Sequence, residues 1–116
     1  MPTKMAAVVD QSTQLFRAFA DPTRLRLLNL LTQGERCVCE LVDVIGQPQP
    51  KVSRHLAYLR RAGLVRTRRD GLWIHYRLAK PASDLHRRLI QCVRCCLGDA
   101  PPLTDDLKRL DRACCR

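Results

Sequence analysis

The residues best suited to chemistry are seven cysteines, a large number for a chain of 116 residues. They fall into three groups: Cys37 with Cys39, Cys92 with Cys95 and Cys96, and Cys114 with Cys115. Thiolate sulfur prefers soft acceptors, among them trivalent arsenic and antimony, cadmium, lead, copper(I) and zinc. The clustering therefore favours a site for a soft metal or metalloid over cysteines that merely fill a core.

The second group has the most favourable spacing. Cys92, Cys95 and Cys96 stand at positions i, i+3 and i+4, which share one face of an α-helix. Three thiolates on one face can surround a pyramidal metalloid, and the adjacent pair can bind an arsenical that carries one organic group. The alternative is packing, because Cys92 and Cys96 also continue an apolar stripe from Leu85 and Leu89, as in a dimer-forming helix.

The other two groups are less regular. Residues at i and i+2 of a helix point about 200° apart, so Cys37 and Cys39 can face one ion only at a distorted helix start. Cys114 and Cys115 either supply a further ligand, from their own or a partner chain, or form a thiol pair without a role. The odd count excludes a complete set of intrachain disulfides, and a reducing cytosol favours free thiols or ligands.

The second chemical feature is basic charge. The formal net charge is +10, from 21 basic and 11 acidic residues. Residues 47–80 carry +8, with Asp70 as their one acidic residue, whereas the rest of the chain carries +2. A segment polarised in this way is typical of a surface that meets the phosphates of nucleic acid. The alternative is a basic face that is only solvated.

The apolar spacing predicts the elements that position these residues. Helices are expected over about 10–20, from Pro22 to just before Gly34, and over 38–45, 49–62 and 83–97, with a last short helix capped by Thr104. Asp21 suits the N-cap of the second helix, and Pro22 suits its first position. Between residues 64–68 and 73–78, which read as strands, Asp70-Gly71 favours a tight hairpin turn.

A short helix, a turn containing Gly46 and a basic-faced helix predict a helix-turn-helix, and the basic hairpin after it predicts a wing. The second helix of such a motif fits the major groove of DNA, and the wing reaches the adjacent backbone or minor groove. Trp73 and Tyr76 are expected to pack in the core or at the root of the wing, with stacking on bases as the alternative. Tyr58 stays undecided between backbone contact and inward packing. The predicted DNA contacts are Gln49, Lys51, Ser53, Arg54, His55 and Arg61 on the helix, and Arg66, Arg68 and Arg69 on the wing.

Four blocks of sequence, in this order and spacing, are shared with a known family. They are residues 19–25 (FADPTRL), 53–56 (SRHL), 59–65 (LRRAGLV) and 70–78 (DGLWIHYRL). The stretch from about residue 10 to residue 80 resembles the ArsR/SmtB family of metalloregulatory repressors, of the arsenic-responsive type. The resemblance implies a homodimeric winged helix-turn-helix repressor that leaves its operator when a metal or metalloid binds.

Two metal sites of that family are incomplete in this chain. Residues 37–41 (CVCEL) resemble the arsenic-sensing signature, but Val42 stands where a third cysteine is expected, and trivalent arsenic takes up to three sulfurs. Asp84 and His86 match the first half of a zinc site on the fifth helix, but the second half is absent. We therefore expect His86 to be a surface residue.

These observations predict a mostly helical protein with one small β-hairpin. A winged helix-turn-helix that dimerises through its terminal helices is expected over 1–97, and a cysteine-containing extension with a short helix over 98–116. No apolar run approaches the roughly 20 residues of a membrane span, so a cytoplasmic location without a membrane partner is expected. A Cys-x-x-Cys enzyme would need a βαβ context, so an enzyme is not expected.

The expected function is a transcriptional repressor that binds double-stranded operator DNA as a homodimer. Trivalent arsenic or antimony, bound by the cysteine thiolates, is expected to release it, and no catalytic cofactor is expected. One alternative is a redox or persulfide switch, for example a disulfide between Cys92 and Cys95. Another is a zinc or cadmium site, for which the supply of cysteines is ample.

Overall fold

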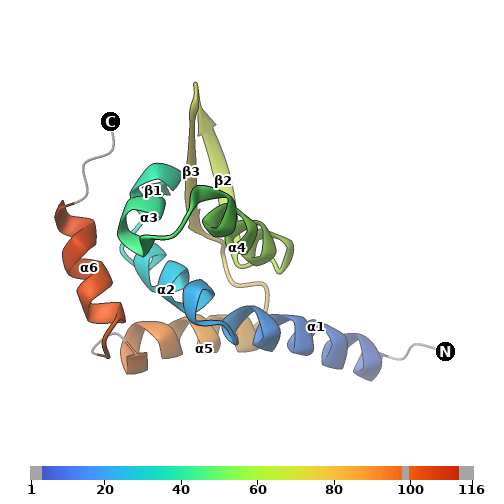
Figure 1. Cartoon of the computed structure of the whole chain (residues 1–116). Coiled ribbons are helices and arrows are strands. Elements are labelled where there is room, and N and C mark those ends of the chain that lie inside the picture. The colour runs from blue at the N-terminus through green and yellow to red at the C-terminus, as the bar shows by residue number, and fades with distance from the viewer. Residues whose placement is uncertain (1–3, 98–99, 113–116) are drawn as a thin grey trace.

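The structure is a computed structural model that describes residues 4–97 and 100–112. It confirms a mostly helical winged helix-turn-helix with a small antiparallel sheet (Figure 1). No helix in this part of the chain is long and apolar enough to cross a membrane. In chain order the elements are α1 (Lys4–Phe19), α2 (Pro22–Leu31), β1 (Arg36–Cys37), α3 (Val38–Ile45), α4 (Gln49–Arg61), β2 (Val65–Asp70), β3 (Trp73–Leu78), α5 (Asp84–Cys92), the π-helical segment η1 (Val93–Leu97) and α6 (Leu103–Arg112).

The helix-turn-helix forms where the local signals predict it. The carboxylate of Asp21 accepts a hydrogen bond from the backbone N–H of Arg24 at 2.9 Å, which caps α2. At the end of α3, Gly46 has a φ of 72°, a left-handed conformation that glycine adopts without a side-chain clash. This turn directs the chain into α4, the candidate recognition helix.

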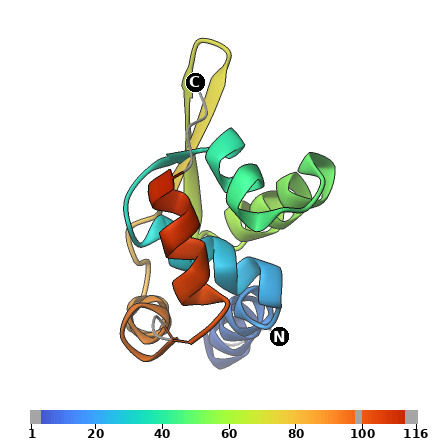
Figure 2. The ribbon, with the colours of Figure 1, turned by 60° about the vertical axis from the view of Figure 1, so that its left-hand side comes forward.

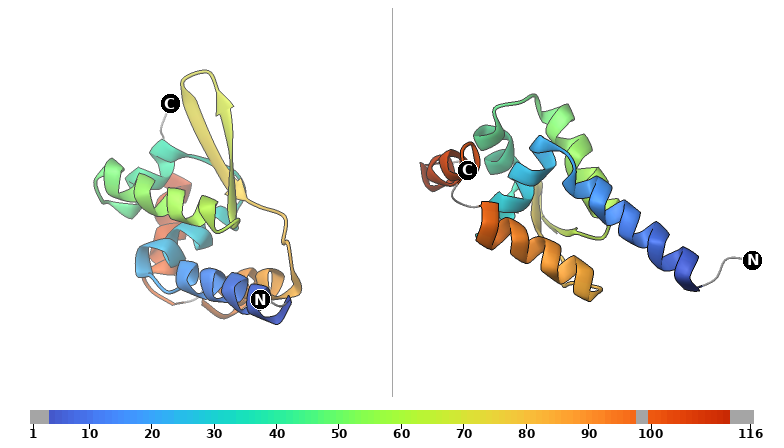
Figure 3. Two further views of the ribbon diagram at one scale, coloured as in Figure 1. Left: turned by 90° about the vertical axis from the view of Figure 1, so that its right-hand side faces the viewer. Right: turned by 90° about the horizontal axis from the view of Figure 1, so that it is seen from below.

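The hairpin of β2 and β3 rises away from the helices as a wing (Figures 1 and 3). Its loop has two residues, and Gly71 takes the positive φ of 61° that the sequence predicted there. The prediction missed β1, a strand of two residues that pairs with β3 and completes a sheet of order β1-β3-β2. Two residues of strand carry too little pattern to be recognised in sequence, because their partner lies about 40 residues away.

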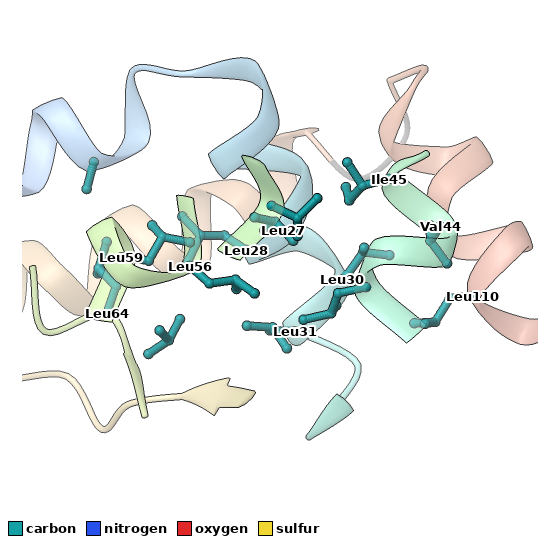
Figure 4. Packing of buried hydrophobic residues seen from close by; sticks show 14 of the residues in the cluster. Leu27, Leu28, Leu30, Leu31, Val44, Ile45, Leu56, Leu59, Leu64 and Leu110 are labelled. Atoms are coloured by element: carbon teal, nitrogen blue, oxygen red, sulfur yellow. The ribbon is translucent and has the colours of Figure 1, made fainter. Parts of the chain in front are cut away.

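The core is built around α2. Figure 4 shows its leucines, Leu27 to Leu31, between residues of α4 on one side and residues of α3 and α6 on the other. From α4 come Leu56 and Leu59, and from α6 comes Leu110. Burial of these side chains stabilises the fold by roughly 2 kcal/mol each. The core therefore fixes α4 and the base of the wing to one rigid helix.

The last helix packs across α2 and α3 (Figure 2). It begins at Leu103, so the expectation that Thr104 caps it is wrong, and Thr104 lies inside the helix. The carboxylate of Asp106, in the first turn of this helix, is buried and accepts two hydrogen bonds from Arg26, at 2.8 and 2.9 Å. Arg109 also donates to this carboxylate. An ion pair across 80 residues leaves no local signature in sequence.

The fifth helix departs from its prediction in the cysteine-rich turn. The sequence predicted one helix over 83–97, whereas α5 ends at Cys92 and continues as the π-helical η1. A π-turn contains an extra residue, so Cys95, at i+3, turns away from the face that Cys92 and Cys96 share at i and i+4. At the other end, α1 begins at Lys4, earlier than the predicted residue 10, and its first half extends beyond the other helices (Figure 1).

Candidate nucleic-acid interface and thiol sites

The N-terminal half of α4 presents polar side chains to solvent, opposite the face that packs in the core. Gln49, Lys51 and Arg54 are exposed, and Ser53 is partly buried. Arg61, near the end of the helix, is also exposed. These five predicted contacts lie along one helix with a free basic face, which can enter a DNA major groove. Whether they touch bases or phosphates stays a prediction.

His55 is placed differently from its neighbours. Its ring Nδ1 lies 3.6 Å from the carboxylate of Asp21 and 3.5 Å from a guanidinium nitrogen of Arg24. The ring therefore faces the beginning of α2 as well as a cavity of about 320 Å³ between α2 and α4. That cavity is lined by Arg24, Lys51, Arg54, His55, Tyr58 and Arg61, and its positive charge suits a phosphate group.

Arg24 is a residue of this region that the sequence analysis missed. Its guanidinium donates to the backbone carbonyls of Ala18, at 2.9 Å, and Arg17, at 2.7 Å. It also stacks on the ring of Tyr58, 4.1 Å from the centroid. Arg24 thus joins the end of α1 to the recognition helix. The contact also decides the orientation of Tyr58, which packs against the core with its ring under Arg24.

The wing carries the three predicted arginines, but they differ in their surroundings. Arg66 and Arg69 are exposed, and neither side chain forms a hydrogen bond or ion pair within the part of the chain that the structure describes. Arg68 instead donates to the carboxylate of Glu35, from Nε at 3.0 Å and from Nη2 at 2.6 Å. This pair lowers the pKa of Glu35, since hydrogen bonding from the guanidinium favours the carboxylate form. In the free protein, the Arg68 side chain is therefore already paired with Glu35.

The two aromatic residues of the wing differ in their burial. Tyr76 packs against the core, and burial raises the pKa of its hydroxyl. Trp73 was expected to pack at the root of the wing, but it is 45% exposed. The physical reason is its place in β3, directly after the hairpin loop and paired with Asp70, beyond the reach of the core. Leu72 beside it is also exposed.

Cys37 and Cys39 form a close pair at the beginning of α3. Cys37 is the N-cap, with an extended backbone (φ −66°, ψ 146°), so the helix start is not regular. The two sulfur atoms lie 2.8 Å apart, and the N–H of Cys39 donates to the sulfur of Cys37 at 3.4 Å. The carboxylate of Glu40 accepts from the N–H of Cys37. The distorted start that sequence analysis required for a shared ion is thus present.

The second cysteine group does not gather into one site. Cys96 shares a side-chain hydrogen bond with Cys92, which raises the pKa of the Cys96 thiol. Cys95 instead lines a separate cavity of about 390 Å³ with Arg87 and Arg94. Within residues 4–97 and 100–112, no three cysteine, histidine or acidic side chains are grouped for a metal ion. The prediction of three thiols on one face is therefore wrong, because η1 is π-helical. Cys114 and Cys115 lie outside the described residues.

His86 is buried, which corrects the expectation of a surface residue. Its side chain is 2% exposed, and its Nδ1 accepts a hydrogen bond from the N–H of Ala82 at 3.1 Å. Burial lowers its pKa. Because Nδ1 is an acceptor, the neutral ring carries its proton on Nε2, which has no partner among the described residues.

An apolar surface lies on α1 beside the start of α5. Val8, Val9 and Phe16 are exposed on α1. A cavity of about 490 Å³ separates α1 from α5 and is lined by Leu15 and Leu85, among other residues. Exposed apolar side chains along one helix are typical of a protein–protein contact. The geometry is consistent with dimerisation through terminal helices.

Comparison with known proteins agrees with this architecture. The family profile described as "Bacterial regulatory protein, arsR family" matches residues 21–67. The "Probable mercury resistance operon repressor" of Streptomyces lividans is 39% identical over 102 residues, which is 87% of this chain and 78% of that protein. The "Arsenical resistance operon repressor" of Escherichia coli is 54% identical over 67 residues, 57% of each chain. The chain thus spans little more than half the length of the latter.

Solved structures extend the likeness to the fold. A homodimeric winged helix-turn-helix DNA-binding domain from Mycobacterium bovis superposes with a TM-score of 0.69 at 36% identity, covering 80% of this chain and 86% of that one. Reduced HlyU from Vibrio cholerae superposes with a TM-score of 0.67 at 32% identity, covering 78% and 92%. With its winged helix-turn-helix and a relative aligned over most of both lengths, the chain belongs to the arsR family of bacterial regulatory proteins.

Proposed function

We propose that this protein is a transcriptional repressor that binds operator DNA as a homodimer and is released by trivalent arsenic or antimony compounds. The observation that supports this class of inducer is the pair of sulfur atoms of Cys37 and Cys39, which lie 2.8 Å apart at the start of α3. Two converging thiolates are ligands for soft acceptors. The names of two relatives, an arsenical and a mercury resistance operon repressor, support the same ligand class.

DNA binding in this proposal uses the basic face of α4 and the wing. The α4 residues are Gln49, Lys51, Ser53, Arg54, His55 and Arg61, and the wing residues are Arg66, Arg68 and Arg69. The homodimer would form through the apolar surface of α1 and the start of α5, which places two recognition helices on one operator. Half-sites about one helical turn apart match such a dimer.

The thiol pair lies next to the DNA-binding elements, which supports coupling between them. In the sheet, Cys37 pairs with His75 of the wing, and the helix that follows Cys37 is the first helix of the helix-turn-helix. Binding of a metalloid to both sulfurs would change the N-cap geometry and so shift β1 or α3. A coupling of about 1–3 kcal/mol, or roughly 5–150-fold in operator affinity, is the usual size of such an effect.

Cys92, Cys95 and Cys96 remain candidate ligands, with Cys114 and Cys115 as further ones. The hydrogen-bonded pair of Cys92 and Cys96 can hold a two-sulfur acceptor, whereas Cys95 would join it only after η1 rearranges. The redox alternative between Cys92 and Cys95 loses support for the same reason. A redox switch at Cys37 and Cys39 is the second candidate, because their sulfurs already lie in contact.

The test is DNA binding by fluorescence anisotropy, on an operator fragment selected by the protein from random DNA, in a non-thiol reductant. Arsenite, phenylarsenite, mercury(II) and cadmium are titrated against wild type, a Cys37/Cys39→Ser variant and a Cys92/Cys96→Ser variant. We expect arsenicals to release wild type and the second variant but not the first. Release that is lost only in the second variant would move the trigger to α5. Release by an oxidant after the reductant has been removed, with no release by any ion, would establish the redox switch instead.

A further inference from the structure

The root of the wing holds a second group of arginines, apart from the basic face of α4. Arg66 of β2 and Arg77 of β3 are direct partners in the antiparallel register, so their side chains leave the same face of the hairpin. Like charges directly opposite each other destabilise a sheet. Neither guanidinium forms a salt bridge with an acidic side chain in the described part of the chain, so no ion pair there offsets this repulsion.

A third arginine completes the group. Arg60, from the last turn of α4, lines a cavity of about 310 Å³ together with Arg66 and Arg77. The remaining lining residues are Gly63, Val65, Thr67 and Ala79, none of them acidic. Glu35 interacts electrostatically with Arg77, but its hydrogen bonds come from Arg68. Three arginines thus line one hollow, and no acidic residue of the described chain lines it.

The backbone adds donors to the same hollow. β2 is an edge strand of the sheet, and its ladder continues from the hydrogen bond of the Ala79 N–H to the Leu64 carbonyl at 2.9 Å. In an antiparallel ladder, hydrogen-bonded and non-hydrogen-bonded pairs alternate. The N–H groups of Val65 and Thr67 therefore point away from β3, toward the open edge that the cavity borders. Sheet edges of this kind form concave sites for anions.

A simpler explanation covers only part of this arrangement. Cations in the last turn of a helix are stabilised by the helix dipole, which accounts for Arg60 and its neighbour Arg61 at the end of α4. It does not account for Arg66 and Arg77, which belong to strands and repel each other. An anion bound between them would remove the repulsion and use the free backbone donors.

We propose that this cavity binds a phosphate-type oxyanion, held by Arg60, Arg66 and Arg77. Guanidinium groups bind phosphate oxygens through paired, charge-assisted hydrogen bonds, and three of them match a group with two or three charged oxygens. The phosphate is either a backbone group of DNA beyond the contacts of α4, in which case the inference rests on the proposed function, or free phosphate in solution.

The test uses Arg60→Gln and Arg77→Gln, with Lys108→Gln as the control. Lys108 is exposed on α6, outside the cavity, and its change removes the same charge. The first measurement is operator affinity as a function of KCl concentration. If the cavity holds a DNA phosphate, each cavity variant lowers the magnitude of the slope of log K against log[KCl] by about 0.9 per protomer, or about 1.8 for the homodimer, the effect of one lost phosphate contact in each half of the dimer. The control leaves the slope unchanged.

The second measurement needs no DNA. The melting temperature is recorded in phosphate and in chloride at equal ionic strength. A site for free phosphate makes the rise in phosphate larger in wild type and the control than in the cavity variants. Either result supports the site and identifies the source of the phosphate. An unchanged salt slope together with an unchanged phosphate response in both cavity variants would overturn the proposal. If wild type binds no operator, the repressor function fails, while the thermal measurement still decides the anion site.

Discussion

Glu35 and Arg68 join the segment before the paired thiols to the wing. The carboxylate of Glu35 stands two residues before Cys37 and accepts hydrogen bonds from both Nε and Nη2 of Arg68. In the sheet register, Arg68 pairs with His75, which pairs in turn with Cys37. Cys37, His75 of the central strand and Arg68, a predicted DNA contact, therefore lie in one row across the sheet. The ion pair of Arg68 with Glu35 links the two ends of this row.

This ion pair predicts an effect on DNA affinity. In the free protein Glu35 competes with DNA phosphates for Arg68, so Glu35→Gln is expected to raise operator affinity about threefold, as for one exposed charge pair. Asp43→Asn is the control, because Asp43 is an exposed acid of α3 and its change alters the net charge equally. Anisotropy titrations at low and moderate salt measure both. Equal gains in the two variants would show that only net charge matters.

The buried ion pair of α6 predicts a loss of stability. Asp106→Asn leaves Arg26 and Arg109 without their counter-ion, and we expect it to lower the free energy of unfolding by about 2–3 kcal/mol. The full cost of a buried pair is not expected, because the Arg26 side chain keeps 17% of its exposure. Asp105→Asn changes an exposed neighbour in the same turn and should have little effect. Urea denaturation of both variants measures the difference, and equal midpoints would contradict a structural role for α6.

The contacts of Arg24 with the end of α1 and with Tyr58 predict that lysine cannot replace arginine at this position. A single ammonium cannot reach the carbonyls of Arg17 and Ala18 and also cover Tyr58. Arg24→Lys is expected to lower the free energy of unfolding by about 1–2 kcal/mol. Arg61→Lys serves as the control, because the Arg61 guanidinium lies farther from the same ring, 6.0 Å from its centroid.

The preference for operator half-site spacing gives a second measurement of the role of Arg24. If Arg24 sets the angle between α1 and α4, the variant should discriminate less between operators whose half-sites are moved by one base pair. A destabilised variant with an unchanged spacing preference would limit Arg24 to a role in folding.

Much of the architecture was predictable because its signals are local. The cap at Asp21, the turn at Gly71 and the apolar spacing of α2 and α4 each lie within a few residues, and the structure agrees with them. The strand β1 and the pair of Asp106 with Arg26 depend on partners far along the chain. No window of sequence contains both members of such a contact, so they could not be predicted.

The candidate site shows the same division. The basic face of α4 follows from helical spacing, whereas the bond that occupies Arg68 spans 33 residues and had no signal. The prediction for the cysteines of α5 and η1 was wrong for a more specific reason. The spacing of Cys92, Cys95 and Cys96 favoured one face, but that argument assumes 3.6 residues per turn, and η1 is π-helical. Cys37 and Cys39, judged unfavourable by the same rule, meet because Cys37 is not helical.

His86 predicts how stability depends on pH. Burial lowers its pKa in the folded state below the ordinary value of 6.5. Above that value the imidazole is neutral in both states. As the pH falls below about 6.5, the unfolded chain binds a proton that the folded protein does not. Stability therefore falls, by up to about 1.4 kcal/mol per pH unit, until the pH reaches the lowered pKa. Protonation of the folded ring would also break the hydrogen bond that Nδ1 accepts from Ala82, at the beginning of α5.

The measurement is urea denaturation between pH 7.5 and pH 5, on wild type, His86→Gln and His75→Gln. We expect the loss of stability over this range to be smaller in His86→Gln, because glutamine does not titrate and its oxygen can accept the Ala82 N–H. His75 lies on the wing, away from α5, so His75→Gln is the control for the loss of a histidine elsewhere in the fold. Equal slopes in all three proteins would mean that the buried ring takes up its proton as readily in the folded state as in the unfolded chain, contrary to the burial seen in α5.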